Sequence, residues 1–168
     1  AHDTGVFQYS NTSPETMQIA GSLIAKGIDF SRIVDDTFYK KTYVQNQILG
    51  RALVESILLL DGRVIAGRLR EKDMEFYGAT PADLDGIVSQ LRVTEGVEVA
   101  IFLYETGNHE YKVSLRSNGP VDVSAVCAYF GGGGHVKAAG CTMHGTIYDV
   151  INNLTLHIEQ QLNQTQDV

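Results

Sequence analysis

Residues 116–140 read RSNGPVDVSAVCAYFGGGGHVKAAG, and the rest of the chain is organised around this stretch. Four consecutive glycines, 131–134, lack Cβ atoms, so their backbone can adopt positive φ angles and approach a ligand closely. Before them, apolar residues at helical spacing predict a short buried helix that begins after Asp122 and stops at Gly131. His135 and a lysine follow the glycines. A bare backbone beside a titratable ring and a cation suits an anionic oxygen, most simply that of a phosphate.

The glycine run also has a purely structural interpretation, in which it only ends the helix and forms a flexible loop. A single glycine would end the helix, and each further glycine adds conformational entropy that folding must overcome. Two known nucleotide-binding motifs are excluded by spacing. Val136 and Lys137 stand where a dinucleotide fingerprint needs another glycine, and no Gly-Lys-Ser/Thr follows as in a Walker loop. We therefore favour a phosphate-binding loop of another kind.

This stretch resembles the GGGGH motif of the C-terminal, substrate-binding domain of DHH-family phosphoesterases, with the RS-x-G-x-VDV segment that precedes it. Within the family it is most similar to the bacterial oligoribonucleases that also remove a phosphate from 3′-phosphoadenosine 5′-phosphate (PAP). In that family the glycine loop, its histidine and the arginine of the RS segment contact the nucleotide. The resemblance therefore implies substrate contacts for six residues: Arg116, Ser117, Gly132, Gly133, Gly134 and His135.

Two side chains near the glycines allow a second interpretation. His135 could be a catalytic base, but no serine or cysteine with a suitably spaced partner is recognisable, so we prefer a substrate contact. Lys137 could also reach a phosphate, although lysines are more often simply exposed to solvent.

Apolar and polar residues alternate over 111–116, which predicts a strand. Its polar side carries Lys112, Ser114 and Arg116, so two cations and a hydroxyl share one surface at the mouth of the glycine loop. For Lys112 and Ser114, a solvated outer face is an equally good interpretation. Arg116 ends the strand, and its planar guanidinium fork suits a phosphate or carboxylate.

Asp3 belongs to the segment HDTGVFQYSNT, residues 2–12. Taken alone, Asp-Thr-Gly is most often an Asx-type turn, and nothing else in the sequence fits the all-β architecture of aspartic proteases. The segment also resembles the last metal-binding motif of DHH phosphoesterases, which implies that Asp3 is a catalytic ligand to manganese. The other ligands of that family do not occur in this sequence, and one carboxylate cannot hold two divalent cations.

Helices and strands are predicted along the whole chain. Ser13 and Asp29 are helix N-caps, an Asp-Gly turn within 58–70 predicts a hairpin, and residues 97–104 are apolar on both faces, as in a central strand. Further helices are predicted over about 42–57, 71–77, 82–91 and 146–158. The expected fold is α+β with α/β character: a mixed β-sheet flanked by helices, preceded by a helical remnant of the N-terminal DHH domain.

The resemblance implies three parts: the C-terminal remnant of the DHH catalytic domain (1–39), a connecting helix (40–57) and the DHH-associated substrate-binding domain (58–168). In an intact enzyme of this family, two Mn²⁺ ions hydrolyse a phosphoester while the C-terminal domain holds the nucleotide. The expected partners are therefore a short RNA or mononucleotide substrate and the missing N-terminal DHH domain. A homodimer is compatible with the sequence. Alone, this chain is expected to bind weakly and hydrolyse nothing.

Composition supports a short ligand. The chain has 168 residues and a formal net charge of −7, and such an acidic protein is a poor non-specific binder of nucleic acid. No apolar run approaches the roughly 18–20 residues of a membrane helix. Two cysteines do not make a disulfide framework. We therefore expect a cytoplasmic protein with reduced thiols.

Two other functions are kept as alternatives. Cyclic-dinucleotide phosphodiesterases of the same family have similar C-terminal motifs. Part of the GGGGH motif also occurs in the RNA-binding C-terminal domain of alanyl-tRNA synthetases, which is a binding module without chemistry. The segment HDTGVFQYSNT favours the phosphoesterase, because a synthetase tail has no reason to carry a metal-ligand motif. Inorganic pyrophosphatases share the metal motifs but have a different C-terminal domain.

Overall fold

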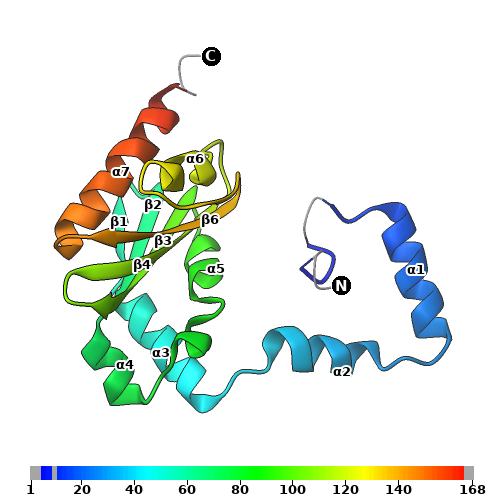
Figure 1. Cartoon of the computed structure of the whole chain (residues 1–168). Helices are drawn as coiled ribbons and strands as arrows, with labels where there is room; N and C mark the ends of the chain where they lie inside the picture. Colours follow the sequence, from blue (N-terminus) through cyan, green and yellow to red (C-terminus); the bar gives the residue numbers. More distant parts are fainter. Residues whose placement is uncertain (1–4, 9–10, 165–168) are drawn as a thin grey trace. The chain divides into compact units, whose positions relative to one another are not determined.

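The computed structural model describes residues 5–8 and 11–164, and they form two compact units that divide between residues 42 and 43 (Figure 1). Asp3, the expected metal ligand, lies outside the described residues. Within the described ranges, no helix is both long and apolar enough to cross a membrane.

The first unit consists of short helices. They are α1 (Pro14–Ala25), α2 (Phe30–Val34) and a π-helix (Asp35–Tyr39). Both predicted N-caps are confirmed, because Ser13 Oγ accepts the Thr16 N–H at 3.2 Å and Asp29 Oδ1 accepts the Arg32 N–H at 3.0 Å. Among this unit's described residues, Val34 is the single buried hydrophobic side chain. This unit therefore has almost no core of its own.

The second unit is built on a six-stranded sheet with the order β1-β2-β3-β4-β6-β5. Its strands are β1 (Ile57–Leu59), β2 (Val64–Leu69), β3 (Val99–Gly107), β4 (Glu110–Ser117), β5 (Gly133–His135) and β6 (Ala138–His144). The β2/β3 pair is parallel and the other neighbouring pairs are antiparallel, so the sheet is mixed. The predicted hairpin, the central strand and the α+β fold class are confirmed.

Helices cover the two faces of the sheet unequally. The second unit's α-helices are α3 (Tyr43–Val54), α4 (Glu71–Tyr77), α5 (Ile87–Arg92), α6 (Val123–Ala128) and α7 (Ile147–Gln164). One core joins α6 and α7 to residues of β2, β3, β4 and β6 (Figure 1). The core on the opposite face joins α3 and α5 to β2 and β3, and contains no buried residue of β4, β5 or β6. Half of this second face is therefore not covered by a helical core.

Three predicted elements differ from the structure. The helix predicted over 82–91 is broken at Gly86, whose φ of +87° is left-handed, into a 3₁₀-helix (Pro81–Leu84) and α5. The helix expected to reach Ile57 ends at Val54, because Ile57 pairs with β2 instead. The end of the glycine run is not a free loop, since β5 pairs with β6.

Candidate functional site

The uncovered half of the sheet carries a continuous polar surface, which we call the polar shelf. Three rows of directly paired residues cross it: Arg116–Ala138–His135, Ser114–Gly140–Gly133 and Lys112–Thr142. Residues directly paired across neighbouring strands lie on the same face of a sheet. The register therefore places part of the glycine run on the same face as the polar side chains of β4, with β6 between them.

The alternation of β4 explains why the polar shelf is polar. Tyr111, Val113 and Leu115 are buried in the core on the opposite face, as the sequence predicted. Lys112 is exposed, and Ser114 and Arg116 are half-buried, because the helices that the structure describes form no core against this half of the sheet. These side chains thus lie on a solvent-facing surface, and their role in ligand binding stays a prediction.

Three of the six predicted substrate contacts share the polar shelf. Arg116 lies at one end of it and donates from Nη1 to its neighbour's carbonyl, Leu115 O, at 2.9 Å. His135 is exposed in the same row, and Gly133 is exposed in the next row. A Cβ atom built on Gly133 would meet no atom within 4 Å, so the space above it is open.

Ser117 is placed differently from the expectation. It is 4% exposed, and its hydroxyl donates to the Gly119 carbonyl at 3.2 Å. Its own N–H donates to the Lys137 carbonyl at 3.1 Å. Ser117 therefore fastens the end of β4 to the segment after β5, and its side chain does not join the polar shelf.

Gly132 is a predicted substrate contact, but its amide is already used inside the protein. The Gly132 N–H donates to Cys127 O at 2.9 Å, and the Gly131 N–H donates to Ala128 O at 3.1 Å. Both amides thus satisfy carbonyls at the C-terminal end of α6. The interpretation of the run as a helix stop holds for these two glycines.

Close packing of β5 against β6 requires a glycine at position 134. Its φ is +149°, and a Cβ atom built on it would lie 2.5 Å from Ala138 O. Its lack of a side chain lets β5 approach β6. Of the four glycines, Gly133 is the one that both belongs to a row of the polar shelf and has open space above it.

A groove of about 500 Å³ lies on the polar shelf. Its lining includes Lys112, Ser114, Phe130, Gly131, Gly132, Gly140 and Thr142. Gly140 and Thr142 had not been foreseen as site residues. The alternation of β6, with Ala139, Cys141 and Met143 buried, is the signal that could have found them.

The polar shelf carries Arg116 at one end and a hydrogen-bonded Glu110–His144 pair at the other. Beyond the Lys112–Thr142 row, Glu110 pairs with His144 in the ladder, and His144 Nε2 lies 3.1 Å from Glu110 Oε2. The Thr106 hydroxyl is the largest cause that holds the pKa of Glu110 below its ordinary value. An anion is therefore favoured near Arg116 and Lys112 and disfavoured near Glu110.

Lys137 lies next to the polar shelf without being part of its rows. It is exposed, and its ammonium donates to the Gly119 carbonyl. This agrees with the interpretation of Lys137 as a solvated lysine. The Gly119 carbonyl also accepts a hydrogen bond from the Ser117 hydroxyl, a contact that the sequence pattern did not indicate.

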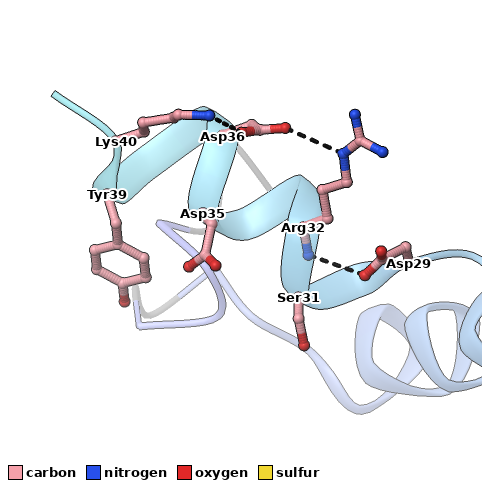
Figure 2. A pocket seen from close by; sticks show the side chains of 7 residues that line it. All are labelled: Asp29, Ser31, Arg32, Asp35, Asp36, Tyr39 and Lys40. Atoms are coloured by element: carbon pink, nitrogen blue, oxygen red, sulfur yellow. Dashed lines mark hydrogen bonds and ion pairs between the residues drawn. The ribbon is translucent and has the colours of Figure 1, made fainter. Parts of the chain in front are cut away.

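A larger hollow, of about 690 Å³, lies on the first unit (Figure 2). The sticks in Figure 2 show that its charged groups already interact: Asp36 contacts Arg32 at 3.5 Å and Lys40 at 3.1 Å. These side chains are 47–78% exposed. Size alone would favour this hollow, but exposed and mutually paired charges on short helices do not converge on a ligand. We therefore place the candidate site on the polar shelf.

The part of the chain that the structure describes does not fit a dinuclear manganese centre. No group of three or more His, Cys, Asp or Glu side chains there is arranged to hold a metal ion. Hard divalent cations need several oxygen ligands each. We therefore derive no metal-dependent step from these residues.

Comparison with known proteins identifies the family of the part of the chain that carries the polar shelf. The DHHA1 domain family matches residues 61–164. The chain belongs to the DHHA1 domain family. This DHHA1 domain contains all of β2 to β6 and therefore the whole polar shelf. The resemblance to the DHH-associated domain is confirmed.

Relatives of this DHHA1 chain are longer proteins. The bifunctional oligoribonuclease and PAP phosphatase NrnA of Thermus thermophilus is 32% identical over 148 residues, covering 88% of this chain and 43% of that protein. The NrnA of Bacillus subtilis is 25% identical over 142 residues, covering 84% and 44%. A solved structure, an exopolyphosphatase-related protein from Bacteroides fragilis, superposes with a TM-score of 0.86 at 25% identity, covering 95% of this chain and 47% of that one. This chain thus spans less than half the length of each.

Proposed function

We propose that this chain is the nucleotide-holding part of a phosphoesterase that hydrolyses short oligoribonucleotides, PAP or both. The observation that carries the proposal is the row in which Arg116 and His135 flank Ala138, next to the open space over Gly133. Relatives described as oligoribonucleases and PAP phosphatases support the substrate class.

Each of these three residues has a distinct part. The Arg116 guanidinium offers a planar fork of donors that matches two phosphate oxygens. The bare Gly133 leaves room for a phosphate to lie against the backbone. His135 belongs to β5, an edge strand whose alternate N–H groups point away from the sheet. The imidazole and these amides supply further donors to the same anion.

Hydrolysis is assigned to the longer protein. Two Mn²⁺ ions would supply the hydrolytic chemistry there. We retain Asp3 as this chain's proposed manganese ligand on the strength of the HDTGVFQYSNT motif alone. The chain's own contribution is to bind the nucleotide and orient its phosphate, and by itself it hydrolyses nothing.

The test is a calorimetric titration of this chain with PAP. Replacing Arg116 by alanine is expected to weaken binding by about 10- to 100-fold, as for the loss of a charged hydrogen bond. His135→Ala should weaken it less. The matched control is Arg32→Ala, which removes an exposed arginine from the first unit and should change nothing. Equal affinities of the Arg116 variant and the unaltered chain would overturn the proposal.

In a longer protein that contains this chain, the two roles separate. Arg116→Ala should leave the manganese content unchanged and weaken PAP binding. Asp3→Ala should lower the manganese content and leave PAP binding unchanged. Loss of metal in both variants would contradict this division.

A further inference from the structure

Asn118 fastens the segment that follows β4 to the segment between α5 and β3. Its side-chain amide donates to Arg92 O at 2.7 Å and to Val97 O at 3.1 Å, and its Oδ1 accepts from Arg92 Nη1 at 2.5 Å. We propose that Asn118 is a positioning residue for Arg116, which holds the end of β4 so that the guanidinium stays where the nucleotide's phosphate binds. This inference rests on the proposed function, because Asn118 acts on the nucleotide through Arg116.

Arg116 lies where the pairing of β4 comes to an end. Its row is the last that joins β4 to β6, and one further row, Ser117 with Val99, joins β4 to β3. The ends of strands open locally at little cost in free energy unless further bonds hold them. The Asn118 N–H supplies such a bond, because it donates to Glu98 O at 2.7 Å. Arg116 therefore has a support two residues later in the chain.

The segment that accepts these bonds is itself anchored. Glu98 Oε1 accepts from Arg63 Nε at 2.7 Å, and the Glu98 N–H donates to Arg63 O at 2.7 Å. Arg63 immediately precedes β2, and both side chains are partly buried. A Cβ atom built on Gly119 would lie 2.5 Å from Glu98 Oε2, so the two segments are in close contact. Asn118 therefore ties the end of β4 to a part of the second unit that is bonded to β2.

Residues 117–119 are held from two sides. Asn118 bonds toward β3, and the Ser117 N–H bonds to Lys137 O, which lies next to β6. A guanidinium that is held in advance loses less conformational freedom when it binds an anion, and such preorganisation raises affinity. The two supports together therefore favour a fixed position for Arg116.

The Asn118–Gly119 pair could also be no more than a turn. Asn-Gly is common in tight turns, because both residues tolerate the backbone angles that such turns need. That role needs the local backbone alone, whereas the Asn118 side chain bonds to Arg92 and Val97, 26 and 21 residues away in the chain. Asn118 is exposed, so its replacement leaves no cavity in a core. An effect on ligand affinity is therefore separable from a loss of packing.

The experiment is a double-mutant cycle of Asn118→Ala and Arg116→Ala in the 168-residue chain, with PAP binding followed by backbone amide NMR shifts. Asn118→Ala alone is expected to weaken PAP binding about three- to tenfold, as for the loss of hydrogen bonds. In the Arg116→Ala background it should cause no further loss, because two residues that act through one contact are not additive. The Arg116 Nε–H signal of the ligand-free chain should also shift or broaden in Asn118→Ala. The matched control is Asn152→Ala, which removes an exposed asparagine of α7 and should change neither readout.

Arg92 gives a second test that leaves Asn118 in place. Arg92→Leu removes the donor to Asn118 Oδ1 and is expected to weaken PAP binding about twofold. Arg92→Gln keeps an N–H donor without the charge and should bind PAP as the unaltered chain does. Equal losses in the two Arg92 variants would mean that the charge matters and the bond to Asn118 does not, which would overturn the positioning role. The Arg92 variants decide the question if Asn118→Ala does not fold.

Failure of the underlying function gives a different result. If PAP does not bind the unaltered chain, or if Arg116→Ala does not weaken its binding, the proposed function itself is wrong and the positioning role falls with it. If PAP binding depends on Arg116, but Asn118→Ala is silent or weakens binding equally in both backgrounds, the function stands and the positioning role alone is refuted.

Discussion

Gly132 lies so close to Cys141 that a Cβ atom built on Gly132 would be 2.5 Å from the Cβ of Cys141. The same atom would lie 2.2 Å from the Gly140 carbonyl oxygen. The adjacent Gly133 has nothing within 4 Å. Close packing against β6 therefore requires a glycine at position 132, whereas the neighbouring Gly133 lies beside open space.

This contrast predicts different effects of alanine at the two positions. Gly132→Ala forces β5 away from β6 and is expected to lower the free energy of unfolding by about 1–3 kcal/mol, as in overpacked cores. Gly133→Ala should change it by less than about 0.5 kcal/mol, as at ordinary surface sites. Urea denaturation measures both values. Equal stability of the two variants would contradict the packing role of Gly132.

Asp122 is expected to stabilise α6 through its N-cap. Its carboxylate accepts the Ser124 and Ala125 N–H groups at 2.9 and 3.1 Å, and the Ser124 hydroxyl at 2.6 Å. Asp122→Ala should therefore cost about 1 kcal/mol of unfolding free energy at neutral pH. Asp122→Asn, which keeps an acceptor oxygen, should cost less. A fully stable alanine variant would show that the cap contributes nothing.

The same cap predicts a pH dependence. The Ser124 hydroxyl, followed by the Ala125 N–H, holds the pKa of Asp122 below its ordinary value. Because the folded-state pKa is lower than the unfolded value of about 3.9, the stabilisation is complete above that value and is lost as the pH falls through the folded-state pKa. The stability difference between the unaltered chain and Asp122→Asn should therefore shrink between pH 5 and pH 2. A difference that stays constant over this range would argue against the cap as its source.

The two cysteines should be unreactive in the folded protein. Cys127 is fully buried and Cys141 is 8% exposed. The hydrogen bond with the Cys141 thiol, together with burial, raises the pKa of Cys127. The same hydrogen bond lowers the pKa of Cys141, so Cys141 is protected by its burial and not by its pKa. Because both thiols are buried, an aromatic disulfide reagent should label neither cysteine until denaturant is added. Rapid labelling of Cys141 in the native protein would mean that β6 is more open than described.

Residues 1–42 are expected to contribute little to the stability of the second unit. Val34 is the one buried hydrophobic side chain among their described members, whereas the second unit has two cores of its own. A chain of residues 43–168 should melt within about 3 °C of the full chain, which corresponds to less than about 1 kcal/mol. Calorimetry tests this, and loss of the cooperative transition would contradict it.

Local sequence signals predicted most of the second unit. The Asp122 cap, the alternation of β4 and the apolar run of β3 depend on residues close together in the chain, and each was correctly predicted. The broken helix at Gly86 was missed because the apolar periodicity continues across the glycine. Its left-handed φ overrides that periodicity.

The candidate site was predicted less completely, because it depends on strand register. Nothing in the local pattern indicates that Gly133 shares a row with Ser114, or that Thr142 lies opposite Lys112. Ser117 and Gly132 were included through the motif as a whole. In the structure the Ser117 hydroxyl and the Gly132 N–H bond internally, while Gly132 also lines the groove on the polar shelf. The roles proposed for Arg116 and His135 stay predictions.

The most direct measurement is a crystal structure of this chain with 5′-AMP. We predict that a phosphate oxygen lies within about 3 Å of an Arg116 guanidinium nitrogen, as in charge-assisted hydrogen bonds, with the phosphate above Gly133 and beside His135. A nucleotide bound elsewhere, such as the hollow between Asp29 and Lys40, with Arg116 making no contact to it, would contradict the account.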